Sequence, residues 1–141
     1  MTFTDAEMSF LRQQQIGRLS TIDRHGRPQI RPVGVHLTAD RTGIEIVGHA
    51  LADTQKWRNV LANPKVAFIV DEVASIRPPR ARGVEIRGTA TVHPGAGTTD
   101  GGLSGDVIRI APQRIVSWGL DAAGTTARSV DGSRRRARDA K

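Results

Sequence analysis

The residues whose types and spacing could do chemistry lie together at Thr54-Gln55-Lys56. A hydroxyl, an amide and an ammonium follow Asp53 there, and aspartate is a common helix N-cap. Free N–H groups at the start of a helix are a natural seat for a phosphate, and Lys56 would add a positive charge. These residues therefore predict an anion site. The alternative is that Lys56 is a solvated surface charge that Asp53 offsets.

The segment that carries these residues is predicted to run strand, loop, short helix, strand. Two apolar stretches, 43–47 and 66–70, have strand patterns and are bounded by turn residues. The residues between them are expected to form a short helix with Trp57, Val60 and Leu61 on its apolar face. The anion site would then lie at a junction between a strand and a helix.

The chain before this segment is expected to form an antiparallel meander. Residues 16–22 and 28–37 have strand character and are separated by a turn signal at 23–26. In the second strand, Pro32 removes a hydrogen-bond donor and Gly34 removes a side chain. These two residues favour either a place where a flat ligand approaches the backbone, or a β-bulge or edge strand. Both possibilities stay open at this point.

The remaining pattern predicts mostly β structure with added helices. The other expected elements are, in chain order, a helix over 4–15, a proline-rich loop over 71–82, a strand over 83–93, and two strands over 106–111 and 114–120 joined at Pro112-Gln113. The total is six or more antiparallel strands, an N-terminal helix and one central crossover helix. So many antiparallel strands in a short chain need closure to protect their edges, so a small β-barrel is expected.

The length of 141 residues suits one domain, and several classes of protein are excluded by composition. The chain has no cysteine, which rules out disulfides and cysteine-ligated metals. Its N-terminus has no basic leader, and no apolar run approaches the length of a membrane span. We therefore expect a soluble, cytoplasmic protein with no membrane partner.

The net charge of +7 raises the question of a nucleic-acid partner. Residues 122–141 hold six basic and two acidic side chains, so more than half of the excess lies in a segment with almost no apolar residues. We expect a folded cofactor-binding domain over 1–121 and a disordered basic tail over 122–141. With two tryptophans, three phenylalanines and no tyrosine, the domain lacks an aromatic platform for stacking bases, which disfavours nucleic-acid binding.

Motifs for catalysis by side chains alone are absent. The sequence has no nucleophile elbow, no phosphate-binding P-loop and no zinc-protease helix. The histidines are scattered without the spacing of metal ligands, at His25, His36, His49 and His93, so no metal is predicted. His36 and His49 could line a pocket or be ordinary polar rim residues. No catalytic residue can be assigned, and in an enzyme the chemistry would belong to a bound cofactor.

Six fragments in order resemble the pyridoxamine 5′-phosphate oxidase-like family of split β-barrels, over about residues 4–121. They include GRLSTI, RPVGV, the strand that ends at Gly48, TQKWRN and NPKVAFIV. Two further stretches, RGVEIRGTA and RIAPQRIVSWGLD, are similar to the actinobacterial branch that uses coenzyme F-420, a deazaflavin. The resemblance implies the FMN-binding split β-barrel fold and a homodimer with two cofactor sites at its interface.

In that family the cofactor ring lies against backbone of the second strand, and the phosphate end meets the junction of strand and helix. Carried over by position, the cofactor-binding residues are Arg31, Pro32, Val33, Gly34, Gly48, His49, Thr54, Gln55, Lys56 and Trp118. Trp118 would lie near the site, either from the same chain or from the partner chain. The triplet at 54–56 matches a Ser-Arg-Lys phosphate clamp, except that Gln55 replaces the arginine and the loop before it is two residues longer.

That departure weakens a site for flavin mononucleotide (FMN) and leaves room for a longer anionic tail. The resemblance implies an oxidoreductase that transfers a hydride between reduced coenzyme F-420 and a small conjugated, enone-like acceptor. The alternatives are an FMN-dependent oxidoreductase of the same fold and a non-enzymatic protein that binds a flavin or deazaflavin. A further hypothesis, from a different class of function, is attachment to nucleic acid through the basic tail.

Overall fold

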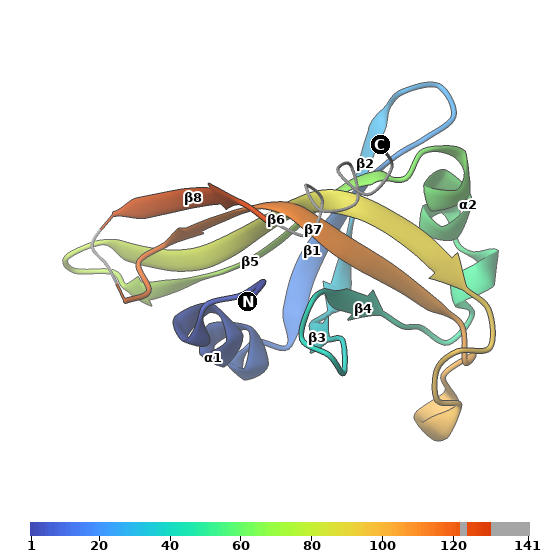
Figure 1. The fold of residues 1–141 in the computed structure, drawn as a ribbon, viewed down its shortest axis with the longest axis horizontal. Helices are drawn as coiled ribbons and strands as arrows, with labels where there is room; N and C mark the ends of the chain where they lie inside the picture. The colour runs from blue at the N-terminus through green and yellow to red at the C-terminus, as the bar shows by residue number, and fades with distance from the viewer. Residues whose placement is uncertain (122–123, 131–141) are drawn as a thin grey trace, which may run out of the picture.

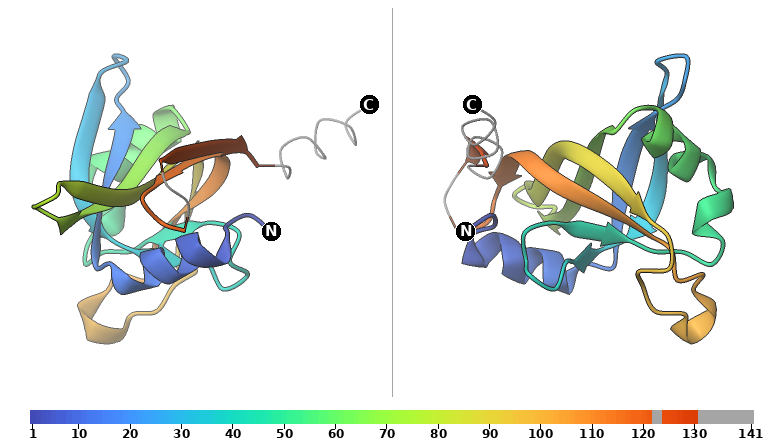
Figure 2. Two further views of the ribbon diagram at one scale, coloured as in Figure 1. Left: turned by 90° about the vertical axis from the view of Figure 1, so that its left-hand side faces the viewer. Right: turned by 45° about the vertical axis from the view of Figure 1, so that its right-hand side comes forward.

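The computed structural model describes residues 1–121 and 124–130, which form one eight-stranded antiparallel sheet and two α-helices (Figures 1 and 2). The elements are, in chain order, α1 (Asp5–Gln13), β1 (Ile16–Ile22), β2 (Pro28–Gly34), β3 (His36–Leu37), β4 (Ile44–Ile46), the 3-10 turn η1 (Leu51–Asp53), α2 (Gln55–Ala62), β5 (Lys65–Ser75), β6 (Arg80–His93), the 3-10 turn η2 (Asp100–Gly102), β7 (Val107–Trp118) and β8 (Thr125–Ser129).

The sheet is strongly curled. Its strand order is β2-β1-β5-β6-β7-β4-β3, with β8 paired to β7. Strands β2 and β3 stand at the two ends of this order although only Val35 separates them in the chain. The sheet must therefore bend round until its ends approach each other. The predicted class, a mostly β barrel with an N-terminal and a central helix, is confirmed.

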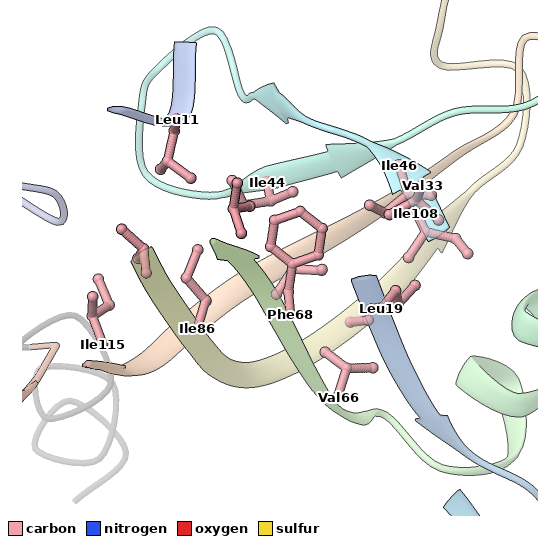
Figure 3. Close-up of a cluster of buried hydrophobic side chains, with 14 of the residues drawn as sticks. Leu11, Leu19, Val33, Ile44, Ile46, Val66, Phe68, Ile86, Ile108 and Ile115 are labelled. Atoms are coloured by element: carbon pink, nitrogen blue, oxygen red, sulfur yellow. The ribbon is translucent and has the colours of Figure 1, made fainter. Parts of the chain in front are cut away.

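The inside of the curled sheet is filled by apolar side chains (Figure 3). Nearly every strand contributes, as shown by the buried residues Leu19, Val33, Ile44, Ile46, Phe68, Ile86, Ile108 and Ile115. Along most of these strands the buried residues alternate with more accessible ones, which is the period-2 pattern of a sheet with one buried face. Burial of this face is what fixes the register of the strands that carry the candidate site.

Helix α2 begins one residue later than the sequence predicts. Thr54, not Asp53, is its N-cap, and the Thr54 hydroxyl accepts a hydrogen bond from the backbone N–H of Trp57 at 3.4 Å. Asp53 instead ends the short turn η1. Trp57 and Val60 are buried as predicted, but Leu61 is 63% exposed.

None of the described helices has both the length and the apolarity needed to cross a membrane.

The predicted loop over 71–82 is wrong, because most of it is strand. Strand β5 continues to Ser75 and β6 begins at Arg80, so only 76–79 form the tip of a hairpin. The two strands pair with each other beyond the curled body and form a projecting arm (Figure 1). Glu72 and Arg82 are paired across this hairpin and form an ion pair. The prolines that suggested a loop lie only at the tip of this hairpin, at 78 and 79.

The predicted turn at Pro112-Gln113 is also wrong, because β7 is continuous from Val107 to Trp118. Its register against β6 shifts between Arg87 and Gly88, and Gly88 is paired with Pro112. A Cβ at Gly88 would lie 2.0 Å from the carbonyl oxygen of Ala111. This irregularity therefore accommodates the proline, which cannot donate a ladder hydrogen bond, without ending the strand.

The fold does not end at Asp121. Residues 125–129 form β8, which pairs with 114–118 of β7, so this part of the predicted disordered tail is ordered. The Arg128 guanidinium donates hydrogen bonds to both carboxylate oxygens of Glu7 and to the carbonyl of Thr2. A mostly exposed edge strand needs no apolar pattern, so the sequence gives no sign of it. Of the predicted tail, residues 122–123 and 131–141 lie outside the described residues.

Candidate cofactor site

A groove lies between the start of α2 and the hairpin formed by β1 and β2. Its volume is about 380 Å³, and its lining residues are Leu19, Thr21, Gln29, Arg31, Thr54, Gln55 and Lys56. Strand β2 presents Arg31 to it, because Arg31 pairs with Leu19 of β1 and shares that strand face with Gln29 and Val33. The structure thus brings together four of the predicted site residues, namely Arg31, Thr54, Gln55 and Lys56.

The groove carries unneutralised positive charge. Burial of the half-buried Lys56 side chain, and then the positive charge of Arg31, lower the pKa of Lys56 below its ordinary value of 10.5. The Arg31 guanidinium donates to the neighbouring carbonyl of Ile30 at 3.0 Å. Within residues 1–121 and 124–130, neither Arg31 nor Lys56 forms an ion pair with a carboxylate. Two facing cations of this kind favour an anion between them.

The start of α2 adds hydrogen-bond donors to this charge. Thr54 accepts from Trp57 as N-cap and donates its own hydroxyl proton to the carbonyl of Leu51 at 2.6 Å. The first N–H groups of a helix have no intrahelical partner, and Gln55 and Lys56 are the first two residues of α2. The groove therefore combines two cationic side chains with backbone N–H groups, which is the donor set of a phosphate or carboxylate site.

Asn59 does not line the groove but contacts three side chains that do, and the sequence did not predict this role. It is 1% exposed, and its side-chain NH₂ donates to the Thr21 hydroxyl and to the Gln29 carbonyl oxygen, each at 2.9 Å. Its own carbonyl oxygen accepts from the Gln55 amide at 2.7 Å. The signal was present, because an asparagine between Trp57 and Val60 interrupts the predicted apolar face of the helix. A buried amide in such a position needs polar partners.

The other predicted residues of β2 do not line the groove. Pro32 is exposed and points to the opposite face of the strand from Arg31, whereas Val33 is buried in the core. Gly34 lies against the ring of His36, where a Cβ would come 2.9 Å from the imidazole Nε2. Strand β2 stands at one end of the sheet, so the edge-strand explanation of Pro32 agrees with the topology.

Gly48 and His49 lie in the loop after β4 and contact a different segment. The carbonyl of Gly48 accepts from the backbone N–H of Ser104 at 2.9 Å, and His49 Nδ1 lies 2.9 Å from the carbonyl oxygen of Gly102. These contacts attach the glycine-rich segment 97–105 to the loop that leads into α2. Neither residue is among those that line the groove.

Trp118 lies at the far end of the sheet from α2. It is paired with Gly83 and Thr125, in the part of β7 that runs beside β8, and Figure 1 shows β8 and α2 at opposite ends of the molecule. A Cβ at Gly83 would come 2.5 Å from its indole ring, so the ring packs directly on the β6 backbone. Contact between Trp118 and the groove would therefore require a second copy of the chain.

Comparison with known proteins agrees with this fold. The family model of pyridoxamine 5′-phosphate oxidase matches residues 3–119, and the chain belongs to this family. A 5a,11a-dehydrotetracycline/5a,11a-dehydrooxytetracycline reductase of Streptomyces rimosus is 41% identical to it, over 96% of this chain and 100% of that protein. The predicted family and the predicted class of enzyme, an oxidoreductase, are confirmed.

Solved structures show the same fold at lower identity. A conserved hypothetical protein from Mycobacterium tuberculosis superposes with a TM-score of 0.64 at 22% identity, covering 82% of this chain and 84% of that one. An F-420 reductase superposes with a TM-score of 0.62 at 21% identity, covering 80% of this chain and 98% of that one. The split-barrel architecture is thus shared well beyond the range of close sequence similarity.

Proposed function

We propose that this chain is a reductase that uses coenzyme F-420 to reduce a conjugated carbon–carbon double bond in a small acceptor, with the cofactor held at the interface of a homodimer. The observation that carries the proposal is the cationic pair of Arg31 and Lys56 at the first turn of α2, which no carboxylate of the described residues neutralises. The full-length similarity to a reductase supports the reaction class.

The chain's own residues would hold the anionic end of the cofactor. Lys56 would pair with it by charge, Arg31 would contact it from β2, and the first N–H groups of α2 would donate hydrogen bonds to it. The residues present therefore fit an anionic cofactor. When bound in its reduced form, the deazaflavin supplies a hydride. The protein contributes orientation and electrostatics, and the second hydrogen of the product arrives as a proton.

The class of acceptor follows from the reductase relative. Its substrates are dehydro compounds, in which the bond between positions 5a and 11a is a double bond. Reducing such a bond adds a hydride to one carbon and a proton to the other. The two chains are similar over their whole length, so we propose a conjugated acceptor of this general kind.

The experiment that tests this proposal is a cofactor titration followed by a turnover assay. Purified protein is titrated with coenzyme F-420 and separately with FMN, while the fluorescence of Trp57 and Trp118 is recorded. We expect coenzyme F-420 to bind more tightly. Much tighter binding of FMN would contradict the proposal and would favour an FMN-dependent oxidoreductase of the same fold.

The turnover assay separates an enzyme from a binding protein. Reduced coenzyme F-420 is supplied with a panel of conjugated acceptors, including a dehydrotetracycline, and its oxidation is followed by absorbance. We expect at least one acceptor to be reduced. Tight cofactor binding with no acceptor reduced would favour a protein that only stores the cofactor.

A further inference from the structure

Gln55 stands where the family clamp has an arginine, and the structure shows what its side chain does instead. Its carbonyl oxygen accepts from Arg58, from Nη2 at 2.9 Å and from Nε at 3.3 Å. Its amide NH₂ donates to the buried Asn59. Both ends of the Gln55 side chain are therefore engaged within the protein, which makes it a poor direct ligand for an anion.

The Arg58 guanidinium is drawn back along α2 towards its start. Besides the two bonds to Gln55, Arg58 Nη1 donates to the backbone carbonyl of Asp53 at 3.0 Å. Asp53 precedes the N-cap, so the guanidinium lies beside the first turn of the helix. An arginine carries five N–H donors, and these contacts use three of them. Arg58 is exposed, and its remaining donors can face a ligand.

Arg58 and Asn59 together set the orientation of the Gln55 amide. An amide can rotate so that its oxygen and nitrogen exchange places, but the Asn59 carbonyl oxygen accepts only from the nitrogen. The Arg58 guanidinium can only donate, so the Gln55 oxygen must face it. The donation of the Asn59 NH₂ to Thr21 and Gln29 agrees with this orientation. The oxygen of Gln55 is thereby directed at Arg58.

Arg58 borders a second cavity that adjoins the groove. This cavity has a volume of about 420 Å³, and its lining residues are Asp23, Arg24, His25, Gln29, Gln55, Arg58, Asn59 and Ala62. Gln29 and Gln55 line both cavities and form the wall between them. The only carboxylate in the second lining is Asp23, which is already ion-paired with Arg27 at 3.3 Å. Positive charge therefore continues from one cavity into the next.

We propose that Gln55 is a positioning residue that acts through Arg58, and that Arg58 binds a second negative group of the ligand whose first anion lies at Lys56. In the family clamp, an arginine at the position of Gln55 supplies a positive charge. In this chain Arg58 would supply that charge, held in place by Gln55. This inference rests on the proposed function, because it concerns the same cofactor. The ligand it requires carries at least two separated anionic groups.

A cycle of substitutions tests the inference. Dissociation constants are measured for coenzyme F-420 and for the same deazaflavin without its anionic tail, with wild type, Arg58→Met, Gln55→Met and the double variant. We expect Arg58→Met to weaken coenzyme F-420 binding about tenfold, which corresponds to one charge-assisted hydrogen bond. The tail-free deazaflavin should bind all four proteins equally.

The double variant shows whether Gln55 works through Arg58. If it does, the double variant should bind coenzyme F-420 no more weakly than Arg58→Met alone. Losses that multiply would mean that Gln55 acts by itself, and an equal loss for the tail-free compound would mean that both residues are merely structural. Either result overturns the inference.

A rescue and a control complete the test. Gln55→Arg in the Arg58→Met background should restore tight binding of coenzyme F-420, because it rebuilds the family clamp. Arg12→Met removes an exposed arginine of α1 and should change neither dissociation constant. If wild type fails to bind coenzyme F-420, the proposed function fails. If wild type binds and Arg58→Met binds equally well, only the present inference fails.

Discussion

At the scale of single residues, the charge of Lys56 suits binding of an anion but destabilises the folded protein when no anion is bound. Its ammonium is half-buried and faces Arg31, and both circumstances disfavour its charged form in the folded protein. Residues arranged for a ligand commonly weaken the free protein in this way. An anion in the groove would remove the penalty, because it would neutralise the two cations.

We predict that Lys56→Met raises the melting temperature of the free protein by a few degrees at neutral pH. The folded-state pKa of Lys56 is lowered, so the unfolded chain binds its proton more tightly and the charge destabilises the fold below that pKa. The advantage of the variant should therefore be fully present below the lowered folded-state pKa and should shrink as the pH rises through 10.5, above which Lys56 is neutral in both states. Thermal melts over a pH series measure this difference.

The same variant should bind the cofactor less well. We expect the dissociation constant for coenzyme F-420 to rise by a factor of about ten or more, the loss of one charge-assisted hydrogen bond. The matched control is Lys65→Met, which removes an exposed lysine at the start of β5. If the dissociation constant of Lys56→Met is unchanged, Lys56 is an ordinary surface charge and does not bind the cofactor.

At the scale of elements, β8 is held by an ionic contact to α1. Burial of Glu7, which is 1% exposed, disfavours its ionisation, but hydrogen bonds from Arg128 and from the backbone of Thr4 outweigh burial and keep its pKa below 4.5. The same carboxylate completes the capping box of α1 with Thr4. One side chain thus joins the first helix to the last strand.

We predict that Arg128→Met destabilises the protein by about 3 kcal/mol, because it leaves the buried Glu7 carboxylate without its positively charged partner. The folded-state pKa of Glu7 is lowered in wild type, so its stabilising contribution is present above pH 4.5 and is lost as the pH falls through that lowered value. Denaturant unfolding at neutral and acidic pH measures both effects. A loss of stability that is the same at every pH would contradict the ionic explanation.

The irregularity between β6 and β7 depends on a glycine. A Cβ at Gly88 would lie 2.0 Å from the backbone oxygen of Ala111, which cannot move without disturbing the ladder. We predict that Gly88→Ala lowers the stability by about 2 kcal/mol or more. Gly48→Ala is the matched control, since its Cβ would meet Leu51 at an ordinary 3.7 Å. Equal melting temperatures of the two variants would show that the β6–β7 contact relaxes freely.

At the scale of the whole molecule, one face of the β1–β2 hairpin remains open. Ile16 is 57% and Ile30 is 56% exposed, and both belong to the strand face opposite to Arg31 and Leu19. Strand β2 is also an end strand of the sheet. Two exposed isoleucines on one face of an end strand are compatible with an interaction surface. They agree with the proposed homodimer, which the family resemblance implies.

We predict that the protein sediments as a dimer, with twice the chain mass of 15.2 kDa. Replacing both Ile16 and Ile30 by aspartate should shift it to the monomer, because charged groups would have to be buried at the interface. Analytical ultracentrifugation of both proteins measures this shift. A wild type that sediments as a monomer at high concentration would contradict the proposed interface cofactor site.

The sequence by itself determined most of the fold class and pointed to four residues of the candidate groove, namely Arg31, Thr54, Gln55 and Lys56. Local chemistry was sufficient to place Thr54 and Lys56 at the start of a helix, because capping residues and a charged first turn depend only on neighbours in the chain, although the N-cap is Thr54 and not the predicted Asp53. The alternating strands were likewise readable, since burial of one sheet face imposes a period of two. The family membership, which the comparisons confirm, rested on fragments that combine both kinds of signal.

The tertiary structure alone decided what depends on partners far apart in the chain. Strand β8 carries no apolar pattern and is defined by its backbone pairing with β7 and by the contact of Arg128 with Glu7, 121 residues away. Pro112 looked like a turn because the glycine that accommodates it, Gly88, lies on another strand. The link from Asn59 through Gln55 to Arg58 likewise depends on Thr21 and Gln29, which only the folding of the β1–β2 hairpin against α2 brings within hydrogen-bonding distance.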